Sequence, residues 1–488
     1  ASRHIGQSIS LVNRESPLVQ VWSGVTAKGF ETFENVVGKQ ASHRSHVDGT
    51  VTDIKKDAIH IQDTSGKKHE VQLYNNYPLN DAKSVMHSTP LVAIGDKIKM
   101  GQTVADTNFS KNGTLALGTN LRVGYVPFKG YNFEDGIVIS QSAADKLSSQ
   151  HLHKHTLPFE EDTVFSPKRF EVQNPTTFTK DQLKKVGDDG IVRVGTKVSP
   201  GDPLILAMKP FRLRDRTGVA AIRRSLAGTH TDKSMRWDSD FQGEVVSTHK
   251  TGKDVIVHVR TIEPMQVGDK MAGRYGNKGI VTMVLPDHDM PHTKDGKHIE
   301  VALNPSGIPG RMNVGQVLEV CAGKVAQKTG KTYTVKNFEP MVDTLARVKS
   351  ELKEHGLSDT EELIDPVSGH SIGKALVGPQ HMLKLVHQVD KKMSVRSGMG
   401  SPGIGSNEHY DMNLQPTSGA GTGGQSMGVL GMYAMLAHGA KANVREMQTW
   451  KSEGADPQTN PSKAWNSQHN QVWTAIQTGQ PLPVPTST

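Results

Sequence analysis

The stretch from Gly268 to Gly279 reads GDKMAGRYGNKG and decides how the rest of the sequence is interpreted. Its four glycines at short, uneven spacing allow positive φ and a close bend of the backbone. Lys270, Arg274 and Lys278 place three cations in this bend, which suits phosphate groups. The Gly-Lys-Ser/Thr ending of a Walker A loop is missing, which excludes nucleotide binding of that type. Taken alone, the stretch also fits a flexible, solvated basic turn.

Three further runs of sequence accompany this stretch. They are GYNFEDGIVIS at residues 130–140, NPSGIPGRMNVGQVLE at residues 304–319, and MLKLVHQVDKKMSVRS at residues 382–397. In this order the four runs resemble motifs of the β subunit of multisubunit DNA-directed RNA polymerases, with Gly136 where serine is usual. Residues 7–19 resemble a family segment that begins upstream of Ala1. The sequence therefore resembles the C-terminal half of a β subunit.

The amino-acid composition and the net charge limit the classes of protein to which this sequence can belong. A chain of 488 residues can form about two to four domains, and 48 glycines with 25 prolines indicate many turns between short strands. The formal net charge of +8 favours polyanionic partners such as nucleic acid. The single cysteine, Cys321, excludes an internal disulfide and a cysteine-ligated zinc site. No apolar run reaches membrane-spanning length and no signal-peptide core is present, so we expect an intracellular protein without membrane contacts.

Periodicity gives three local expectations. From Asp48 onward, apolar and polar residues alternate between turn signals, which predicts short antiparallel strands. A helix is predicted where apolar residues recur at helical spacing, namely Met341, Leu345, Val348 and Leu352. Residues 429–450 also carry apolar residues every three to four positions, which predicts helix there.

The resemblance implies a β-rich, mixed α+β, multidomain fold. The implied parts are an N-terminal connecting segment (1–47), a hybrid-binding region with the first part of a double-psi β-barrel (48–150), a flap domain with a short tip (151–260), the completion of the barrel with the active-centre region (261–400), and a C-terminal segment that anchors the clamp of the β′ partner (401–488). The flap tip, residues 214–236, lacks an obvious apolar helix, which puts conventional sigma docking in doubt. We therefore expect a non-sigma or divergent promoter-specificity factor.

The resemblance also implies the residues of the active centre. Lys270 and Lys278 match residues that contact the RNA 3′ end and the phosphates of the incoming nucleotide, and Arg311 matches an arginine that grips the triphosphate. Glu134 and Asp135 match an acidic pair beside the active centre. Neighbours in an extended strand point to opposite faces, so this pair is not expected to cage one metal. The resemblance implies that Asp135 touches a second magnesium indirectly, through water or nucleotide. The remaining implied nucleotide or nucleic-acid contacts are Arg274, Asn277, Gln7, His387, Lys391 and Arg396.

Several of these residues, taken alone, also fit a second, purely structural interpretation. Arg311 alone fits a surface arginine, the acidic pair fits a solvated turn, and His387 fits a packed helix residue. Alternation along a strand would also allow a metal site made of His151, His153 and His155. The glycine cluster at residues 419–424 could cradle phosphate, but Ser426 stands where family members carry an arginine.

The sequence contains no Asp-x-Asp-Gly-Asp cluster, and the resemblance places the catalytic Mg²⁺ on such a cluster in a β′-like subunit. The chain alone is therefore expected to be inactive. We predict a subunit of a DNA-dependent RNA polymerase, a nucleotidyltransferase. Its partners would be DNA template, RNA transcript, nucleoside triphosphates, a β′-like subunit and the N-terminal half of β. A split β subunit with a short flap resembles the polymerases of giant bacteriophages, which implies the cytoplasm of a bacterial host, or packaging in a virion. The alternative is a non-catalytic, nucleic-acid-binding structural protein with the same fold.

Overall fold

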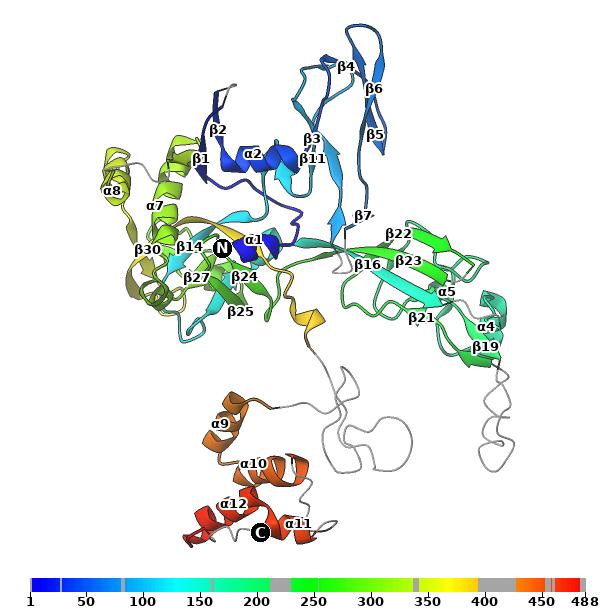
Figure 1. Ribbon diagram of the computed structural model, residues 1–488, viewed down its shortest axis with the longest axis vertical. Helices are drawn as coiled ribbons and strands as arrows, with labels where there is room; N and C mark the ends of the chain where they lie inside the picture. The colour runs from blue at the N-terminus through cyan, green and yellow to red at the C-terminus, as the bar shows by residue number, and fades with distance from the viewer. Residues whose placement is uncertain are drawn as a thin grey trace, which may run out of the picture. The chain divides into compact units, whose positions relative to one another are not determined.

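The protein is described by a computed structural model (Figure 1). The described residues are 2–26, 29–79, 84–158, 162–210, 230–252, 254–336, 342–393, 427–452, 458 and 461–482. The chain divides into two compact units, residues 1–389 and residues 390–488. Small sheets dominate the first unit, and the described part of the second is helical. The strand-rich, mixed α+β class expected from the sequence is confirmed.

The largest sheet described in the first unit has eight strands. Six of them pair in a closed ring, in the order β14, β27, β15, β25, β24 and β30, with β30 pairing back to β14. Their bounds are Thr119–Tyr125 (β14), Gly136–Ser140 (β15), Lys270–Ala272 (β24), Lys278–Leu285 (β25), Val301–Leu303 (β27) and Ser371–Lys384 (β30). Two more strands, β29 (Thr360–Ile364) and β26 (His292–Thr293), extend the sheet beyond β30. The ring therefore joins segments that lie far apart in the sequence.

The ring closes over an apolar core because its strands are rich in branched and other apolar residues. Leu121, Val123, Ile139, Val281 and Met382 are buried in this core. Full burial of one such side chain stabilises a fold by about 1.5–3 kcal/mol. The strands that carry the polar motifs are therefore held in fixed register by their apolar neighbours.

Helix α7 (Val314–Thr329) packs against β30 at unusually close range. A Cβ on Gly323 would lie 2.8 Å from the carbonyl oxygen of Pro379, and a Cβ on Gly378 would lie 3.0 Å from that of Val320. Any larger side chain at these two positions would push helix and strand apart. Glycine on both sides of the contact is what permits this approach.

The helix predicted from Met341 onward is confirmed as α8 (Thr344–Glu354). Val348 and Leu352 are buried against α7, as the spacing predicted. Leu345 is 49% exposed, so it is not part of that buried face. Met341 lies outside the described residues.

The short antiparallel strands predicted from Asp48 onward are also confirmed. β4 (Gly49–Ile54), β5 (Ala58–Asp63) and β6 (Lys68–Gln72) pair in sequence order, and β10 (Lys97–Ile98) pairs with β4. Alternate residues of these strands face a small apolar core that includes Val51, Ile59, Ile61 and Val71.

A four-stranded sheet is built on a long antiparallel ladder between β16 (Ser149–Pro158) and β23 (Asp254–Glu263), visible in Figure 1. β22 (Gly243–Lys250) pairs with β23, and β17 (Lys197–Val198) pairs with β22. Trp237 and the valines of β23 are buried in the core of this region. Residues 211–229, which hold most of the predicted flap tip, lie outside the described residues.

The second unit contains α9 (Val429–Ala437), α10 (Lys441–Glu446), α11 (Pro461–Asn466) and α12 (Gln468–Thr478) among its described residues. The first two confirm the helix predicted within residues 429–450. The predicted features that lie outside the described residues are the glycine cluster 419–424, Ser426 and Arg396.

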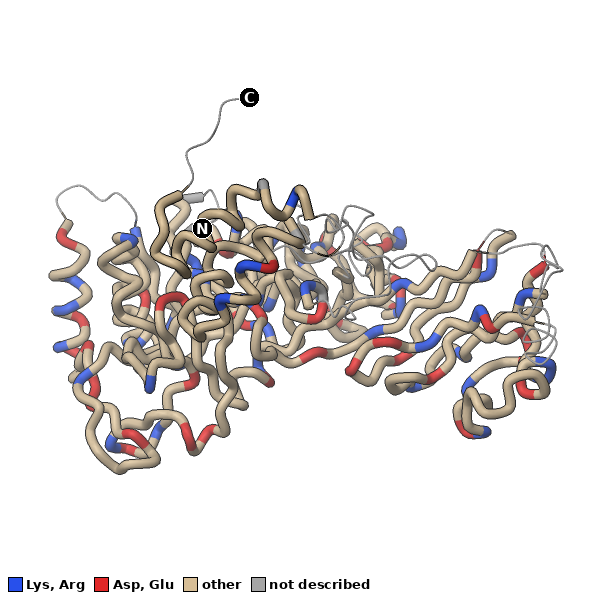
Figure 2. The backbone as a smooth tube through the Cα atoms, turned by 90° about the horizontal axis from the view of Figure 1, so that it is seen from below, with Lys and Arg blue, Asp and Glu red and all other residues tan. Residues whose placement is uncertain are grey.

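Charge and hydropathy add two observations on the described residues. Figure 2 shows basic and acidic residues interspersed along the chain, so its net positive charge is not confined to one segment. Among the described helices, none is both long and apolar enough to span a bilayer.

Candidate active site

The glycine-rich stretch forms a β-hairpin. β24 and β25 pair antiparallel, with Lys270 opposite Ile280. The Gly273 N–H donates to the carbonyl oxygen of Asn277 at 3.0 Å across the turn. Gly276 has a φ of 85°, which glycine adopts without strain. The close bend with positive φ that the glycine spacing predicted is therefore a tight hairpin turn, with positive φ at Gly268 and Gly276.

Gly279 brings this hairpin against the acidic motif. A Cβ on Gly279 would lie 2.2 Å from the carbonyl oxygen of Asp135. The Ile280 N–H donates to that same oxygen at 3.0 Å. Glu134 has a φ of 53°, and both acidic residues lie in a turn that precedes β15. The assumption that they occupy an extended strand is therefore wrong, and they lie in an exposed turn, as in the alternative interpretation.

Residues of three separate sequence motifs line one pocket at this contact. Its described lining includes Glu134, Asp135, Asn277, Lys278, Arg311 and Gln316. Glu134 and Asp135 precede β15, Lys278 begins β25, and Arg311 ends a short 3₁₀ helix, Pro309–Arg311. The closed ring of strands thus gathers two carboxylates, an ammonium and a guanidinium in one place.

An ion pair joins two of these residues. Arg311 Nη1 lies 2.6 Å from Asp135 Oδ1, and the two side chains are 46% and 48% exposed. The hydrogen bond to Asp135, together with its charge, raises the pKa of Arg311 above its ordinary value. Because water reaches both groups, this ion pair contributes little stability, and Arg311 can exchange Asp135 for another anion.

A second group of predicted residues meets at the other strand of the hairpin. The Lys270 N–H donates to the carbonyl oxygen of His387 at 3.1 Å. His387 Nε2 lies 3.3 Å from Gln7 Oε1, and the Val386 N–H donates to the Gln7 carbonyl oxygen at 2.9 Å. The structure therefore brings Lys270, Gln7 and His387 together. His387 follows the end of β30, so its alternative interpretation as a packed helix residue is wrong.

Arg274 points away from the pocket into a network of carboxylates. Its Nε donates to Glu319 Oε1 at 3.1 Å, its Nη2 also binds Glu319, and its Nη1 donates to Glu34 Oε1 at 3.3 Å. Burial raises the pKa of Glu319, although the charge of Arg274 opposes this effect. Arg274 is thus engaged by the protein itself, and the nucleic-acid contact implied for it stays a prediction.

The structure adds residues that sequence reasoning did not single out. Lys384 is fully buried and donates to the carbonyl oxygens of Glu263 and Pro264 at 3.0 and 3.1 Å. Asp269 is also buried, and its carboxylate accepts the N–H of Val389 at 2.9 Å. Both residues hold the ends of β30 and β24 in place. The one signal for Lys384 was a lysine inside the apolar run MLKLVH.

Two buried amide oxygens in the pocket lack a partner in the part of the chain that the structure describes. Asn277 Oδ1 and Gln316 Oε1 find no hydrogen-bond donor among the described residues. A buried acceptor without a donor is unfavourable, so these oxygens favour a bound donor group such as a nucleotide hydroxyl, a base amine or water. Gln316 was not predicted, because a glutamine in a helix carries no distinguishing pattern.

Two predicted contacts are not placed in detail. Lys391 ends a short 3₁₀ helix, Val389–Lys391, and its side chain is not described. Arg396 lies outside the described residues. Both stay predictions.

The three alternating histidines lie on β16, beside Glu263 and Trp237. Within the described ranges, no cluster of three or more His, Cys, Asp or Glu residues is arranged to hold a metal ion. His151 and His153 instead lie beside Glu263, with Nε2 to carboxylate distances of 3.3 and 3.1 Å. His155 lies against the ring of Trp237. The described contacts therefore give no support to a metal site at these three histidines.

A family model described as RNA polymerase Rpb2, domain 6, matches residues 44–402, which include the hairpin, the acidic turn and Arg311. The chain belongs to the RNA polymerase β-subunit family. The β subunit of Treponema denticola is 33% identical over 474 residues, covering 92% of this chain and 39% of that protein. The β subunit of Mycoplasmopsis synoviae (strain 53) is 30% identical, covering 92% and 37%, and that of Synechococcus elongatus is 32% identical, covering 92% and 42%.

This β-family chain spans about two fifths of the length of those relatives. The matched range contains the pocket residues and His387 but not Gln7. The resemblance carried by four short motifs therefore extends through the intervening sequence.

Proposed function

We propose that this chain is a subunit of a DNA-dependent RNA polymerase and supplies the β side of its active centre. The observation that carries the proposal is the pocket in which Lys278, Arg311, Glu134 and Asp135 meet from three separate motifs. Membership of the β-subunit family supports the same conclusion. The relatives bear the name of DNA-directed RNA polymerase β subunits.

In the proposed reaction, an RNA 3′ hydroxyl attacks the α-phosphate of a nucleoside triphosphate and pyrophosphate leaves. The protein's task is to position these groups and to face developing negative charge with fixed cations. Lys270 and Lys278 would contact the RNA end and the phosphates as compact point charges. Arg311 would leave Asp135 and hold two triphosphate oxygens with its planar guanidinium.

The reaction also requires Mg²⁺, which would neutralise the phosphate charge and orient the attacking oxygen. The carboxylates of Glu134 and Asp135 are oxygen ligands of the kind that Mg²⁺ prefers. The described residues offer no third protein ligand beside them. We therefore infer that a β′-like partner holds the ion, with Asp135 reaching a second ion through water, and that this chain is inactive alone.

The finer architecture belongs to the same proposal. The closed ring of six strands would be the double-psi β-barrel, completed within residues 261–400. The sheet of β16, β23, β22 and β17 would form the flap, residues 151–260. The connecting, hybrid-binding and clamp-anchoring segments keep the limits given from the sequence.

The proposed complex would include the N-terminal half of β, DNA, RNA and nucleoside triphosphates, with a non-sigma or divergent specificity factor. We place it in the cytoplasm of a bacterial host, in a split form resembling giant-bacteriophage polymerases, used there or packaged in the virion.

The deciding experiment purifies the chain with its native partners and measures single-nucleotide addition on a primed template. Changing Lys270 and Lys278 together to Ala should slow addition by about 10²- to 10³-fold, because phosphate-facing charge is lost. The matched control changes Lys349 and Lys353 of α8 to Ala, which removes the same charge from an exposed helix face. Co-purification of the partners shows whether assembly survives. Unchanged addition by the assembled Lys270/Lys278 variant would sink the proposal and favour the non-catalytic structural alternative.

A further inference from the structure

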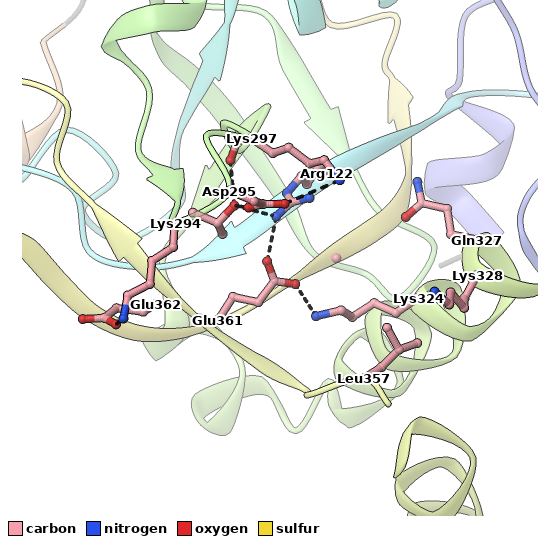
Figure 3. A pocket seen from close by; sticks show the side chains of 12 residues that line it. Arg122, Lys294, Asp295, Lys297, Lys324, Gln327, Lys328, Leu357, Glu361 and Glu362 are labelled. Carbon is pink, nitrogen blue, oxygen red and sulfur yellow. Dashed lines mark hydrogen bonds and ion pairs between the residues drawn. The ribbon is translucent and has the colours of Figure 1, made fainter. Parts of the chain in front are cut away.

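A second pocket lies between the outer strands of the eight-stranded sheet and helix α7 (Figure 3). It has a volume of about 620 Å³, within the usual range for small-molecule sites. Its described lining consists of Arg122, Thr293, Lys294, Asp295, Lys297, Lys324, Gln327, Lys328, Leu357, Glu361, Glu362 and Gly378. This lining shares no residue with that of the candidate active site.

The lining is strongly polar and its charges do not balance. Five side chains are cationic and three are carboxylates, which leaves an excess of two positive charges. Leu357 is the one large apolar side chain in the described lining. An apolar ligand therefore finds little surface here, whereas a small polyanion finds complementary charge.

The inner cations of this pocket are fixed in place by one carboxylate. Figure 3 shows Glu361 between Arg122 and Lys324. Arg122 Nη2 lies 2.7 Å from Glu361 Oε2, and Lys324 Nζ binds Oε1 of the same carboxylate. Lys324 also donates to the carbonyl oxygen of Ser358 at 2.8 Å, and its side chain is only 10% exposed. The two inner cations are thus held before any ligand arrives, which reduces the ordering cost of binding.

One donor of the inner cations is unused by the described residues. Arg122 Nε is buried and finds no acceptor among the described residues, although its Nη2 also donates to Thr293 Oγ1 at 3.2 Å. A buried donor without an acceptor is unfavourable by about 1–3 kcal/mol. The guanidinium of Arg122, which lines the pocket, therefore has a donor that the described residues do not use.

The outer cations, in contrast, can move. Lys294 lies 2.6 Å from Glu362 and Lys297 lies 3.5 Å from Asp295, and both lysine side chains are mostly exposed. Lys328, in the last turn of α7, has no carboxylate within 4.0 Å in the described part of the chain. Exposed ion pairs are weak, so these lysines can turn toward a stronger anion.

We propose that this pocket binds a small anion with at least two phosphate groups, such as an inorganic polyphosphate or the polyphosphate of a nucleotide. The pocket, at about 620 Å³, is larger than one phosphate group, and its cations are spread over α7, β14 and the turn after β26. Arg122 and Lys324 would bind one phosphate, and Lys294 and Lys328 would close on another. This proposal does not depend on the polymerase assignment.

The test is isothermal titration calorimetry on the full chain in its partner complex, without divalent metal. The chain carries Lys278→Ala and Arg311→Ala to disable phosphate binding at the candidate active site. Tripolyphosphate and ATP are titrated separately, at low salt and at about 0.15 M salt. Equal affinities for tripolyphosphate and ATP would mean that the pocket contacts the phosphate groups alone. Tighter binding of ATP would identify a nucleotide as the ligand.

Variants on this background give opposite expected shifts. Lys294→Ala with Lys328→Ala should weaken tripolyphosphate binding about tenfold, because two phosphate-facing charges are lost. Glu362→Gln should tighten it roughly threefold, because the lining gains net positive charge while its shape is kept. The control Lys353→Ala, on the exposed face of α8, should change nothing.

Three outcomes would overturn the proposal. The first is the absence of saturable binding up to about 1 mM ligand. The second is equal weakening by Lys353→Ala and by the Lys294/Lys328 pair. The third is a shift in the same direction for Glu362→Gln and that pair. Glu362→Gln preserves the size and the acceptor oxygen of the side chain, so a folding failure would not mimic its expected gain.

Discussion

The candidate active site and the pocket beside α7 hold similar charges in different ways. In the candidate active site, Arg311 and Asp135 form a solvent-exposed ion pair, and each side chain is about half exposed. In the pocket beside α7, Glu361 holds Arg122 and the nearly buried Lys324. A solvated pair exchanges its partner at little cost, whereas a desolvated group cannot lose its partner without a large penalty. The first arrangement suits a site that must release its ligand in every cycle, and the second suits a rigid cradle.

The largest effect is expected from Arg311. Changing Arg311 to Ala should slow single-nucleotide addition by about 10²- to 10³-fold, because the guanidinium faces the triphosphate. The free energy of unfolding should change by less than about 1 kcal/mol, since the exposed pair with Asp135 contributes little. Single-turnover kinetics and denaturant unfolding of the same preparation check both statements. A large loss of stability with normal addition would reverse the roles assigned to the two pockets.

The buried carboxylate of Glu263 extends the contrast between exposed and buried charges to the pH dependence of stability. Burial alone would raise the pKa of Glu263, but the hydrogen bond from His153 and the charge of His151 lower it to about 2. Because the folded pKa lies below the unfolded value, this stabilisation is present above about pH 4.5 and is lost as the pH falls toward 2. We expect the wild type to lose about 3 kcal/mol more than Glu263→Gln over that interval. Parallel denaturant titrations at several pH values measure the difference, and identical slopes would show that folding does not lower the pKa of Glu263.

The next prediction concerns Glu361, the carboxylate that holds Arg122 and Lys324 in the pocket beside α7. Glu361→Gln leaves Arg122 and Lys324 without a charged partner, which should lower the free energy of unfolding by about 1–3 kcal/mol. Nucleotide addition by the assembled complex should stay normal, because the residue belongs to the other pocket. Glu362→Gln, an isosteric change on the same strand but at a more exposed ion pair, serves as the control and should cost well under 1 kcal/mol. Equal destabilisation by the two variants would remove the distinction between fixed and movable cations.

The smallest effect is expected at the close backbone contact between the hairpin and the acidic turn. Gly279→Ala would place a Cβ 2.2 Å from the carbonyl oxygen of Asp135, so hairpin and acidic turn must separate. We expect a loss of about 1–2 kcal/mol in stability and about tenfold slower addition, because Lys278 and Asp135 no longer share one pocket. Gly252→Ala, where an added Cβ meets nothing within 4 Å, is the control. Normal addition by Gly279→Ala would show that this close contact does not position the site.

Local elements followed from the sequence because they depend on neighbouring residues. The strands from Gly49 to Gln72 and helix α8 were predicted from periodicity, which reports burial on one face. The prediction for the acidic turn failed for a related reason. The sequence did not reveal that Glu134 would adopt a positive φ, since that conformation depends on the hairpin packed against it.

Some residues of the candidate active site could be predicted from the sequence, and others could not. Lys278, Arg311, Glu134 and Asp135 could be singled out because each lies in a motif that resembles the β-subunit family. Arg274 came from the same motif but faces Glu319 and Glu34, and nothing in the linear pattern separates it from its neighbours. Gln316 gave no signal, and the one signal for Lys384 was its place inside an apolar run, because the roles of both residues arise from burial.

The sequence by itself determined the family and the identity of the charged residues at the candidate active site. These depend on residue types at fixed spacing. The tertiary structure alone decided which charges meet, which are desolvated and which carboxylate holds which cation. The pocket beside α7 is the clearest case, because its lining comes from separate segments between Arg122 and Gly378 that only the closed ring and its packed helix bring together. Electrostatic strength depends on distance and on access to water, and neither is encoded at any single position of the chain.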